Sequence, residues 1–457
     1  MSAWSKVPRC GGALRNIRLC RVYRHARRLS TTLVSASSVA SYVGELKTRG
    51  LVRLSYPSNL DSDFAAELRS LPPLIYAGFD PTAESLHIGN LLIVVNLLRS
   101  AQFGVRPIAV VGGATAAVER EEQDKDSLMK NTKAIKDQLR SVARNVLNDE
   151  LTVVDNNEWF REMSMVDYLR SCKQFRVGEM LRMGAVKAHL SEQGGGISFT
   201  EFSYQTMQAY DWAMLLKKYD CRFQIGGSDQ LGHLDVGAHY IKRTTGTFAA
   251  GVCLPLVTDS AGNKLGKSVG GGEVWLSAKL TSPFHFYQFL RQLHDTEAEH
   301  MYRQYSLARW EDVQAVIEKH RSNLGKWIVQ EALAVELTRV VHGEEGLETA
   351  QRCSRALFQG SMSDVKSLSR EELLSLFGNT VKVPRNDIQT MGDLADRTRS
   401  DNVKGSTLMT KGAFKVNGEK TVDSAAPLVP DQVGLPEAPD LTLICWGKRK
   451  FQLVQWV

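Results

Sequence analysis

Short apolar runs that end in glycine alternate with longer amphipathic stretches over the first two thirds of the chain. The β-prone run Leu74–Ala77 meets Gly78, and Pro107–Val111 ends at a pair of glycines. Between them, His87–Ser100 has the spacing of a helix. This succession predicts a doubly wound, Rossmann-like α/β domain with a parallel sheet, which binds ligands at the carboxyl ends of its strands.

The pattern changes further along the chain. Residues 151–203 are expected to form a charged, helical insertion, after which a helix near Tyr204–Tyr219 and a strand at Arg222–Ile225 resume the α/β pattern. From about residue 283, long helical patterns with few glycines predict a separate domain. The predicted segments are a leader (1–44), a nucleotide-binding catalytic domain with its insertion (45–280), a helical domain (281–380) and a small α+β domain (381–457).

The formal charge of +7 comes from the amino terminus. Residues 1–44 hold eight of the 57 Lys and Arg residues and none of the 50 Asp and Glu residues, so the remainder is close to neutral. An Arg- and Ser-rich segment without acids is typical of a mitochondrial transit peptide, which predicts the mitochondrial matrix. A basic arm that binds RNA and a plain unstructured leader are the alternatives.

Two classes of protein are excluded by composition. No run of 18 apolar residues could span a bilayer, so no membrane anchor is predicted. The seven cysteines include no C-x-x-C pair and have no His cluster nearby, which argues against a structural zinc site or a disulfide framework. No protein-bound metal is predicted.

The first candidate chemistry lies in Tyr76–Leu91, with the sequence YAGFDPTAESLHIGNL. Its glycines let a nucleotide approach the backbone, and a helix amino terminus favours anions. Thr82 and His87 supply donors where phosphate charge develops. Taken singly, His87 fits a capping or core histidine better than a catalytic one.

The second candidate is the loop 263–268, NKLGKS. A mobile loop with Lys264 and Lys267 can bring cations to a polyphosphate and then release them. A solvated hairpin tip is the alternative. A P-loop is disfavoured because it needs glycine where the chain has Ala261.

The segments His87–Asn90 and Lys264–Ser268 resemble the two nucleotide-binding signatures of class I aminoacyl-tRNA synthetases. Phe199–Asp211 and Gln224–Gln230 are similar to the tyrosine-specific subgroup. The resemblance runs from about residue 45 to the carboxyl terminus. It implies activation of L-tyrosine by ATP with Mg²⁺, transfer to tRNA(Tyr), and a homodimer formed near Phe199.

The resemblance also implies roles for single residues. Tyr76 and Asp211 would hydrogen-bond the phenol hydroxyl, because phenylalanine would leave both groups unpaired. A solvated helix face remains the alternative for Gln208 and Asp211, as does core packing for Tyr204. The implied tyrosine site is Tyr76, Asp80, Tyr204, Gln208, Asp211, Gln224 and Gln230; the ATP site is Gly78, Asp80, Thr82, His87, Gly89, Asn90, Gly226, Gly227, Ser228, Asp229, Lys264, Lys267 and Ser268, with Thr82, His87, Lys264 and Lys267 as catalytic groups.

For RNA, Gly412–Lys420 resembles the core of the S4 RNA-binding domain, which makes 381–457 S4-like and 281–380 the anticodon-side helical domain. Basic residues on such a module grip the phosphate backbone. A charged, solvated surface is the alternative. The RNA candidates are Lys411, Lys415, Lys420, Lys448, Arg449 and Lys450 in the tail, and Lys173, Arg176, Arg182 and Lys187 in the insertion.

The chain departs from the family after Gly112–Ala116. Members usually continue into a loop of the type I-G-D-P-S-G-K/R, which supplies an aspartate for the substrate amino group and basic residues near ATP. Here the chain continues directly as Ala117–Glu122, and neither Asp124 nor Lys125 is placed to replace the loop. A splice variant or faulty gene model is one hypothesis, and a catalytically impaired, synthetase-like RNA-binding protein is the alternative function.

Overall fold

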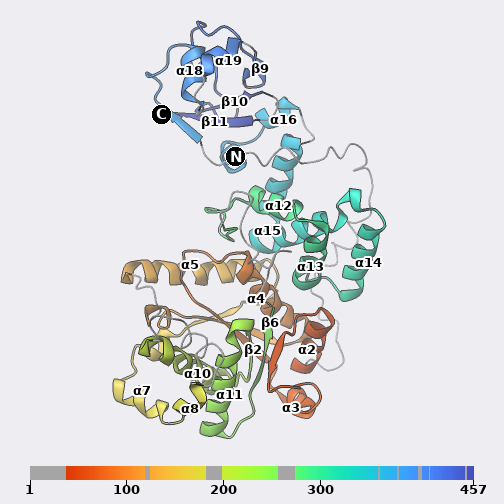
Figure 1. Ribbon diagram of the computed structural model, residues 1–457, viewed down its shortest axis with the longest axis vertical. Helices are drawn as coiled ribbons and strands as arrows, with labels where there is room; N and C mark the ends of the chain where they lie inside the picture. The colour runs from red at the N-terminus through yellow and green to blue at the C-terminus, as the bar shows by residue number, and fades with distance from the viewer. Residues whose placement is uncertain are drawn as a thin grey trace. The chain divides into compact units, whose positions relative to one another are not determined.

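The computed structural model describes residues 38–118, 124–181, 198–255, 273–358, 361–377, 380–399, 404–410, 412–447 and 450–457. The described residues form two compact units (Figure 1). The larger unit holds the residues up to 280 together with 290–341, and the smaller unit holds 281–289 and the residues from 342 onward.

The larger unit is built on a six-stranded sheet with the order β1-β6-β5-β2-β3-β4. All neighbouring strands are parallel except β1, which pairs antiparallel with β6 at one edge. The doubly wound fold predicted from the sequence is therefore confirmed. The strands are β1 (Leu54–Tyr56), β2 (Leu74–Phe79), β3 (Arg106–Val111), β4 (Thr152–Asp155), β5 (Phe223–Gly227) and β6 (Ala250–Leu254).

The topological switch point lies between β2 and β5. From β2 the chain winds outward through β3 and β4, and it then returns to the other side of β2 with β5 and β6. The central strands are apolar along most of their length because both faces of the sheet are covered. The carboxyl ends of β2 and β5 thus open the crevice in which such sheets bind ligands.

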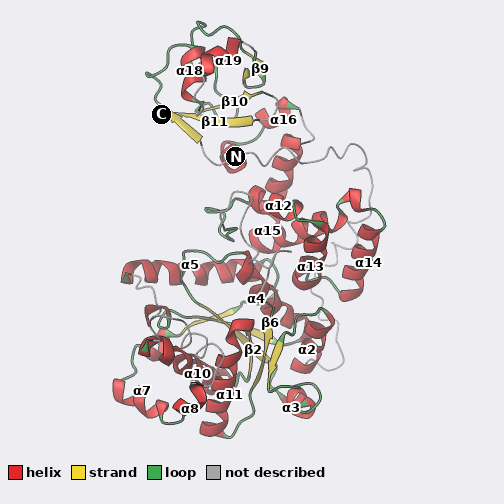
Figure 2. Ribbon diagram, in the orientation of Figure 1, coloured by secondary structure: helices red, strands yellow, loops and turns green. Residues whose placement is uncertain are grey.

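Helices surround this sheet (Figure 2). Helices α10 and α11 pack so closely that a Cβ atom at Gly237 would lie 2.6 Å from Cε3 of the buried Trp212. The helices of the larger unit are α2 (Val39–Thr48), α3 (Ala65–Ser70), α4 (Ile88–Arg99), α5 (Lys125–Arg144), α6 (Asn157–Phe160), α7 (Met165–Cys172), α8 (Val177–Met180), α10 (Phe199–Tyr219), α11 (Leu231–Thr245), α13 (Asp295–Tyr305) and α14 (Trp310–Arg321).

Two sequence expectations need correction or closer definition. The start of the expected insertion at 151 is wrong, because β4 pairs in parallel with β3 inside the main sheet. Three of its four residues, in the sequence TVVD, are β-branched and the strand is partly buried, but the charged stretches around it hid the strand signal. At the other end, the predicted leader overlaps α2, in which Val39 and Tyr42 are fully buried. Residues 1–37 of the leader lie outside the described residues.

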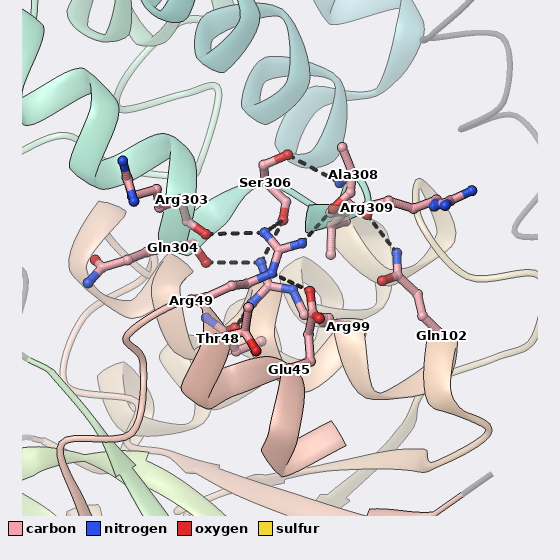
Figure 3. A network of polar contacts seen from close by, with 12 residues as sticks. Glu45, Thr48, Arg49, Arg99, Gln102, Arg303, Gln304, Ser306, Ala308 and Arg309 are labelled. Carbon is pink, nitrogen blue, oxygen red and sulfur yellow. Dashed lines mark hydrogen bonds and ion pairs between the residues drawn. The ribbon is translucent and has the colours of Figure 1, made fainter. Parts of the chain in front are cut away.

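Two buried arginines fasten the carboxyl end of α13 to the α/β part of the same unit (Figure 3). Arg49, which follows α2, donates to the carbonyl oxygen of Ser306 at 2.9 Å. Arg99, at the end of α4, donates to the carbonyl oxygens of Gln304 at 3.0 Å and Ser306 at 2.6 Å. The last carbonyls of a helix have no partner within it, so the two guanidiniums satisfy groups that would otherwise be buried unpaired.

The smaller unit contains a mixed sheet with the order β7-β11-β10-β8-β9. Only β7 and β11 pair in parallel, and the other neighbours are antiparallel. Helices α12 (Pro283–Arg291) and α15 (Ile328–Phe358) have residues in both units, and α15 is interrupted at Gly343, where φ is 74°. The other elements are β7 (Thr380–Val383), β8 (Phe414–Val416), β9 (Glu419–Lys420), β10 (Leu441–Trp446), β11 (Lys450–Trp456), α16 (Met362–Lys366), α17 (Arg370–Phe377), α18 (Met391–Arg397) and α19 (Gly405–Thr410).

Among the described residues, none of the helices has the length and hydropathy needed to cross a bilayer.

Candidate active site

Polar side chains gather at the carboxyl ends of the parallel strands. Asp80 follows β2, Asn156 follows β4, and Gln230 follows β5. A cavity of about 680 Å³ lies at the opposite edge, where Leu74, Arg106 and Thr152 begin their strands. In a doubly wound sheet, ligands bind at the carboxyl edge, so the polar cluster and not this cavity is the candidate site.

Asp211 is the most deeply buried acid of the cluster. Its two carboxylate oxygens accept hydrogen bonds from Trp159 Nε1 at 2.8 Å and Asn156 Nδ2 at 3.3 Å. Burial raises the pKa of Asp211 to about 8; these two donors lower that pKa and the nearby charge of Asp80 raises it. The side chain faces the site on a buried side of α10, so the solvated-face alternative for Asp211 is wrong.

This raised pKa predicts how stability depends on pH. A carboxyl group with a folded-state pKa near 8 holds a proton that the unfolded chain has already lost above about pH 4. The free energy of unfolding should therefore fall as pH rises from about 5 to 8, by up to about 1.4 kcal/mol per pH unit from this group. Urea unfolding at several pH values measures the difference in the free energy of unfolding between the wild type and Asp211→Asn. The other titrating groups are common to both proteins, so their contributions cancel in this difference. Parallel pH profiles would contradict the shift.

Tyr76 lies opposite Gln224 in the register of β2 and β5. Its hydroxyl donates to Gln224 Oε1 at 2.7 Å, and both side chains are buried. Burial raises the pKa of Tyr76, and the charge of Asp211 contributes to that rise. The structure thus brings together three residues of the predicted tyrosine site, with hydroxyl, amide and carboxyl groups converging in an otherwise apolar place.

Asp80, which follows β2, is held by one side chain from α10 and one from the turn after β3. Tyr204 donates its hydroxyl to Asp80 Oδ2 at 2.8 Å, and Thr115 Oγ1 lies 3.4 Å from Asp80 Oδ1. A Cβ atom at Gly112 would come within 2.3 Å of the same oxygen, so only glycine leaves room for this carboxylate. Tyr204 therefore points into the site and is not a core-packing residue.

Asp80 and Asp211 are linked through neutral side chains. Asn156 Nδ2 lies 3.2 Å from Thr115 Oγ1, and the same amide group contacts Asp211. The backbone amide of Ala114 donates to Asn156 Oδ1 at 2.7 Å, which fixes the amide orientation. The turn after β3 is thereby tied to both acids.

Two more predicted residues, Gln208 and Gln230, lie near the start of α11. Gln208 of α10 hydrogen-bonds through Oε1 to Nδ1 of His233, so its side chain is turned toward the site and not toward solvent. Gln230 is the N-cap residue of α11, and a Cβ atom at Gly226 would lie 3.1 Å from Gln230 Cβ. Gly226 and Gly227 are the last two residues of β5, and Gly226 lies against the site residue Gln230.

The first nucleotide signature forms the amino terminus of α4. His87 is the N-cap residue, and its Nδ1 accepts a hydrogen bond from the Gly89 amide at 3.0 Å. Asn90 Oδ1 in turn accepts from the His87 amide at 3.1 Å. The capping interpretation of His87 is confirmed, and it leaves the proton of the neutral imidazole on Nε2, which can donate to an anion.

Several predicted residues cannot be placed. Lys264, Lys267 and Ser268 lie outside the described residues, as do Lys411, Lys448, Arg449, Arg182 and Lys187. The side chains of Asp229 and Lys450 are likewise not described. Part of the departing segment, 119–123, also lies outside, and the nearby Asp124 caps α5 by accepting from the amides of Asp126 and Ser127 at 3.0 Å.

Sequence reasoning missed four polar side chains of the site: Thr115, Asn156, Trp159 and His233. Asn156 and Trp159 follow the strand β4, which was hidden in the expected insertion. Recognising TVVD as a strand would have placed both at the carboxyl edge of the sheet. For His233, the signal was its position in the first turn of the helix that follows the glycine pair of β5.

Comparison with known proteins identifies the family. The family model described as tRNA synthetases class I (W and Y) matches residues 70–359. The mitochondrial tyrosine–tRNA ligase of Drosophila melanogaster is 36% identical over 411 residues, covering 84% of this chain and 87% of that protein. The human mitochondrial enzyme of the same name is 33% identical over 440 residues, covering 90% and 91%.

A solved structure agrees with these relatives. A C-terminally truncated mitochondrial tyrosyl-tRNA synthetase from Aspergillus nidulans is 26% identical and superposes with a TM-score of 0.62, over 74% of this chain and 99% of that one. The fold, the polar cluster at the carboxyl edge and the relatives agree. The chain belongs to the class I tRNA synthetases of the tryptophan and tyrosine group and is, as a member, a ligase.

Proposed function

We propose that this chain activates L-tyrosine with ATP and transfers the tyrosyl group to tRNA(Tyr) in the mitochondrial matrix. The observation that carries the choice of tyrosine is the buried group of Tyr76, Gln224 and Asp211. A phenol hydroxyl can both donate and accept there, whereas a phenyl ring would cover these polar groups and offer them no hydrogen bond. The named tyrosine ligases among the relatives support the same substrate, and the mitochondrial ones support the compartment.

The chemistry needs no nucleophile from the protein. The tyrosine carboxylate attacks the α-phosphorus of ATP, the bond to the β-phosphate oxygen breaks, and pyrophosphate leaves. A ribose hydroxyl of the tRNA then attacks the carbonyl carbon of the adenylate, and AMP leaves. In this scheme Nε2 of His87 and the amino terminus of α4 stabilise phosphate charge together with Thr82.

The cationic side chains of this scheme are Lys264 and Lys267, the two lysines of the second signature. Mg²⁺ enters with the ATP phosphates, since nucleotide-bound Mg²⁺ keeps mostly phosphate and water ligands. No group of three or more metal-ligating side chains occurs within the part of the chain that the structure describes.

Tyrosine-dependent exchange of labelled pyrophosphate into ATP tests the proposal. We expect exchange with L-tyrosine and far less with phenylalanine or tryptophan. If the protein binds tRNA but shows no exchange with any of the three amino acids, the alternative function, a synthetase-like RNA-binding protein, is favoured. That alternative was considered because the segment after Ala116 is shorter than in the family. Exchange at a rate typical of such enzymes would mean that the remaining residues suffice for activation.

The proposed homodimer is supported by exposed apolar side chains on the segment that carries α7, α8 and the start of α10. Several large apolar side chains exposed on neighbouring segments suit a surface that a second copy of the chain covers. Phe199 is 78% exposed. The other exposed apolar residues of these elements are Met165, Val166, Leu169, Val177 and Leu181.

A charge in this surface should prevent dimerisation. Phe199→Asp would place a carboxylate in the apolar contact, so light scattering should give a monomer where the wild type gives a dimer. Lys217→Asp, at an exposed position near the other end of α10, is the matched control and should remain dimeric. A monomeric wild type would refute the proposal.

For tRNA, we propose that residues 381–457 of the smaller unit form the S4-like module and that Lys415 and Lys420 contact the phosphate backbone. The two residues pair across β8 and β9 next to the turn at Gly418. Lys420 is exposed, which suits contact with a large polyanion.

A further inference from the structure

A histidine in the first turn of α11 contacts two residues of the proposed tyrosine site. Nδ1 of His233 is hydrogen-bonded to Oε1 of Gln208. Its ring also lies 5.6 Å from the ring of Tyr204, with 55° between the two planes. Tyr204 and Gln208 are one turn apart on α10, so the imidazole spans both.

The backbone explains why His233 reaches α10. The glycine at 237, one turn further along α11, lies against Trp212 so closely that any Cβ atom would collide with the indole. The same close packing of α10 and α11 brings the first turn of α11 against the side chains of Tyr204 and Gln208 on α10. His233 is therefore placed by the fold and not by a flexible loop.

In this contact the Gln208 amide presents its oxygen to the imidazole. The amide of glutamine can present either an oxygen or an NH₂ group to a ligand. Because Nδ1 of a neutral imidazole carries a proton when it meets an amide oxygen, the Gln208 oxygen is directed to His233 and its rotamer is restricted. A side chain that is already ordered loses less entropy when a ligand binds.

We propose that His233 is a positioning residue for the amino and carboxyl end of the amino-acid substrate. It acts through the Gln208 amide and the Tyr204 ring, while Tyr76 and Asp211 read the phenol end. This role rests on the proposed function, in which Gln208 and Tyr204 hold the backbone end of tyrosine. The hydroxyl of Tyr204 already donates to Asp80, so a tilt of its ring would also disturb that carboxylate.

The test is steady-state pyrophosphate exchange with three variants. His233→Ala should raise KM for tyrosine about 3- to 10-fold with kcat little changed, as expected for the loss of one neutral hydrogen bond that supports ground-state binding. His233→Asn should restore KM, because the asparagine Nδ2 occupies nearly the place of the histidine Nδ1. His239→Ala, on the exposed side of the same helix, is the matched control and should leave KM unchanged.

A double-mutant cycle with Gln208→Ala tests whether His233 acts through Gln208. If it does, His233→Ala should raise KM by a smaller factor once Gln208 is alanine than it does in the wild type, and the part that remains is the contribution of the Tyr204 contact. Additive effects, an unchanged KM in His233→Ala, or failure of asparagine to restore KM would each overturn the proposal. Absence of tyrosine-dependent exchange in the wild type would instead reject the proposed function. The preference for tyrosine over phenylalanine should stay the same in His233→Ala, because the altered contact is at the other end of the substrate.

Discussion

Replacing Asp211 with alanine is expected to abolish most of the preference for tyrosine over phenylalanine. The phenol hydroxyl would enter a buried site from which its acceptor has been removed, a loss of about 2–4 kcal/mol. This corresponds to a fall in kcat/KM for tyrosine of about 30- to 1000-fold. Phenylalanine makes no hydrogen bond there, so its kcat/KM should change little. Pyrophosphate exchange with both amino acids measures the two values.

The variant also removes the acceptor of Trp159 Nε1 and Asn156 Nδ2, so a thermal unfolding curve must accompany the kinetics. Asp211→Asn keeps the volume and one acceptor oxygen and serves as the second variant. Asp137→Ala, at an exposed acid of α5, is the control and should alter neither substrate. An equal fall in kcat/KM for both amino acids would mean that Asp211 only supports the fold and does not read the hydroxyl.

The parts of the fold that follow from local pattern were predictable. β2 and β3 were predicted because their apolar runs end at glycines, and α4 was predicted because its apolar positions have helical spacing. β4 was not, because its four residues are partly exposed at the edge of the sheet and carry too little apolar signal. The pairing of β2 with β5 depends on contacts between residues far apart in sequence, which periodicity does not report.

The site was predictable where a short motif holds several groups at once. His87, Gly89 and Asn90 act together as the cap of one helix, so the sequence shows them side by side. The series of hydrogen bonds that links Asp80, Thr115, Asn156 and Asp211 joins residues from the ends of three strands and from one helix. Asp80 and Asp211 were named only through the family resemblance, and Thr115 and Asn156 were not named at all; the parallel sheet brings the four within hydrogen-bonding distance of one another.

The cluster of buried arginines offers the second large effect, on stability. Arg99→Met should lower the free energy of unfolding of the larger unit by about 3–5 kcal/mol, the usual loss when one member of a buried charged network is removed. Methionine matches the length of the side chain, but it cannot donate to the carbonyl oxygens of Gln304 and Ser306. It also leaves Glu336 with less compensation: burial raises the pKa of this half-buried acid, and the charges of Arg49 and Arg99 oppose that rise. Chemical unfolding followed by circular dichroism measures the change.

Arg309→Met is the matched control for this variant, because Arg309 lies beside the same turn of chain with its side chain 83% exposed (Figure 3). It should change stability by less than about 0.5 kcal/mol.

The loss at Arg99 should also reach the active site, since α13 ends in Tyr305, whose hydroxyl donates to the carbonyl oxygen of Ile88 at 3.1 Å. Ile88 follows His87 in the nucleotide signature, so a loosened α13 should raise KM for ATP more than KM for tyrosine. A stable Arg99→Met protein with unchanged KM for ATP would show that the arginines satisfy carbonyls without holding α13 and α4 together.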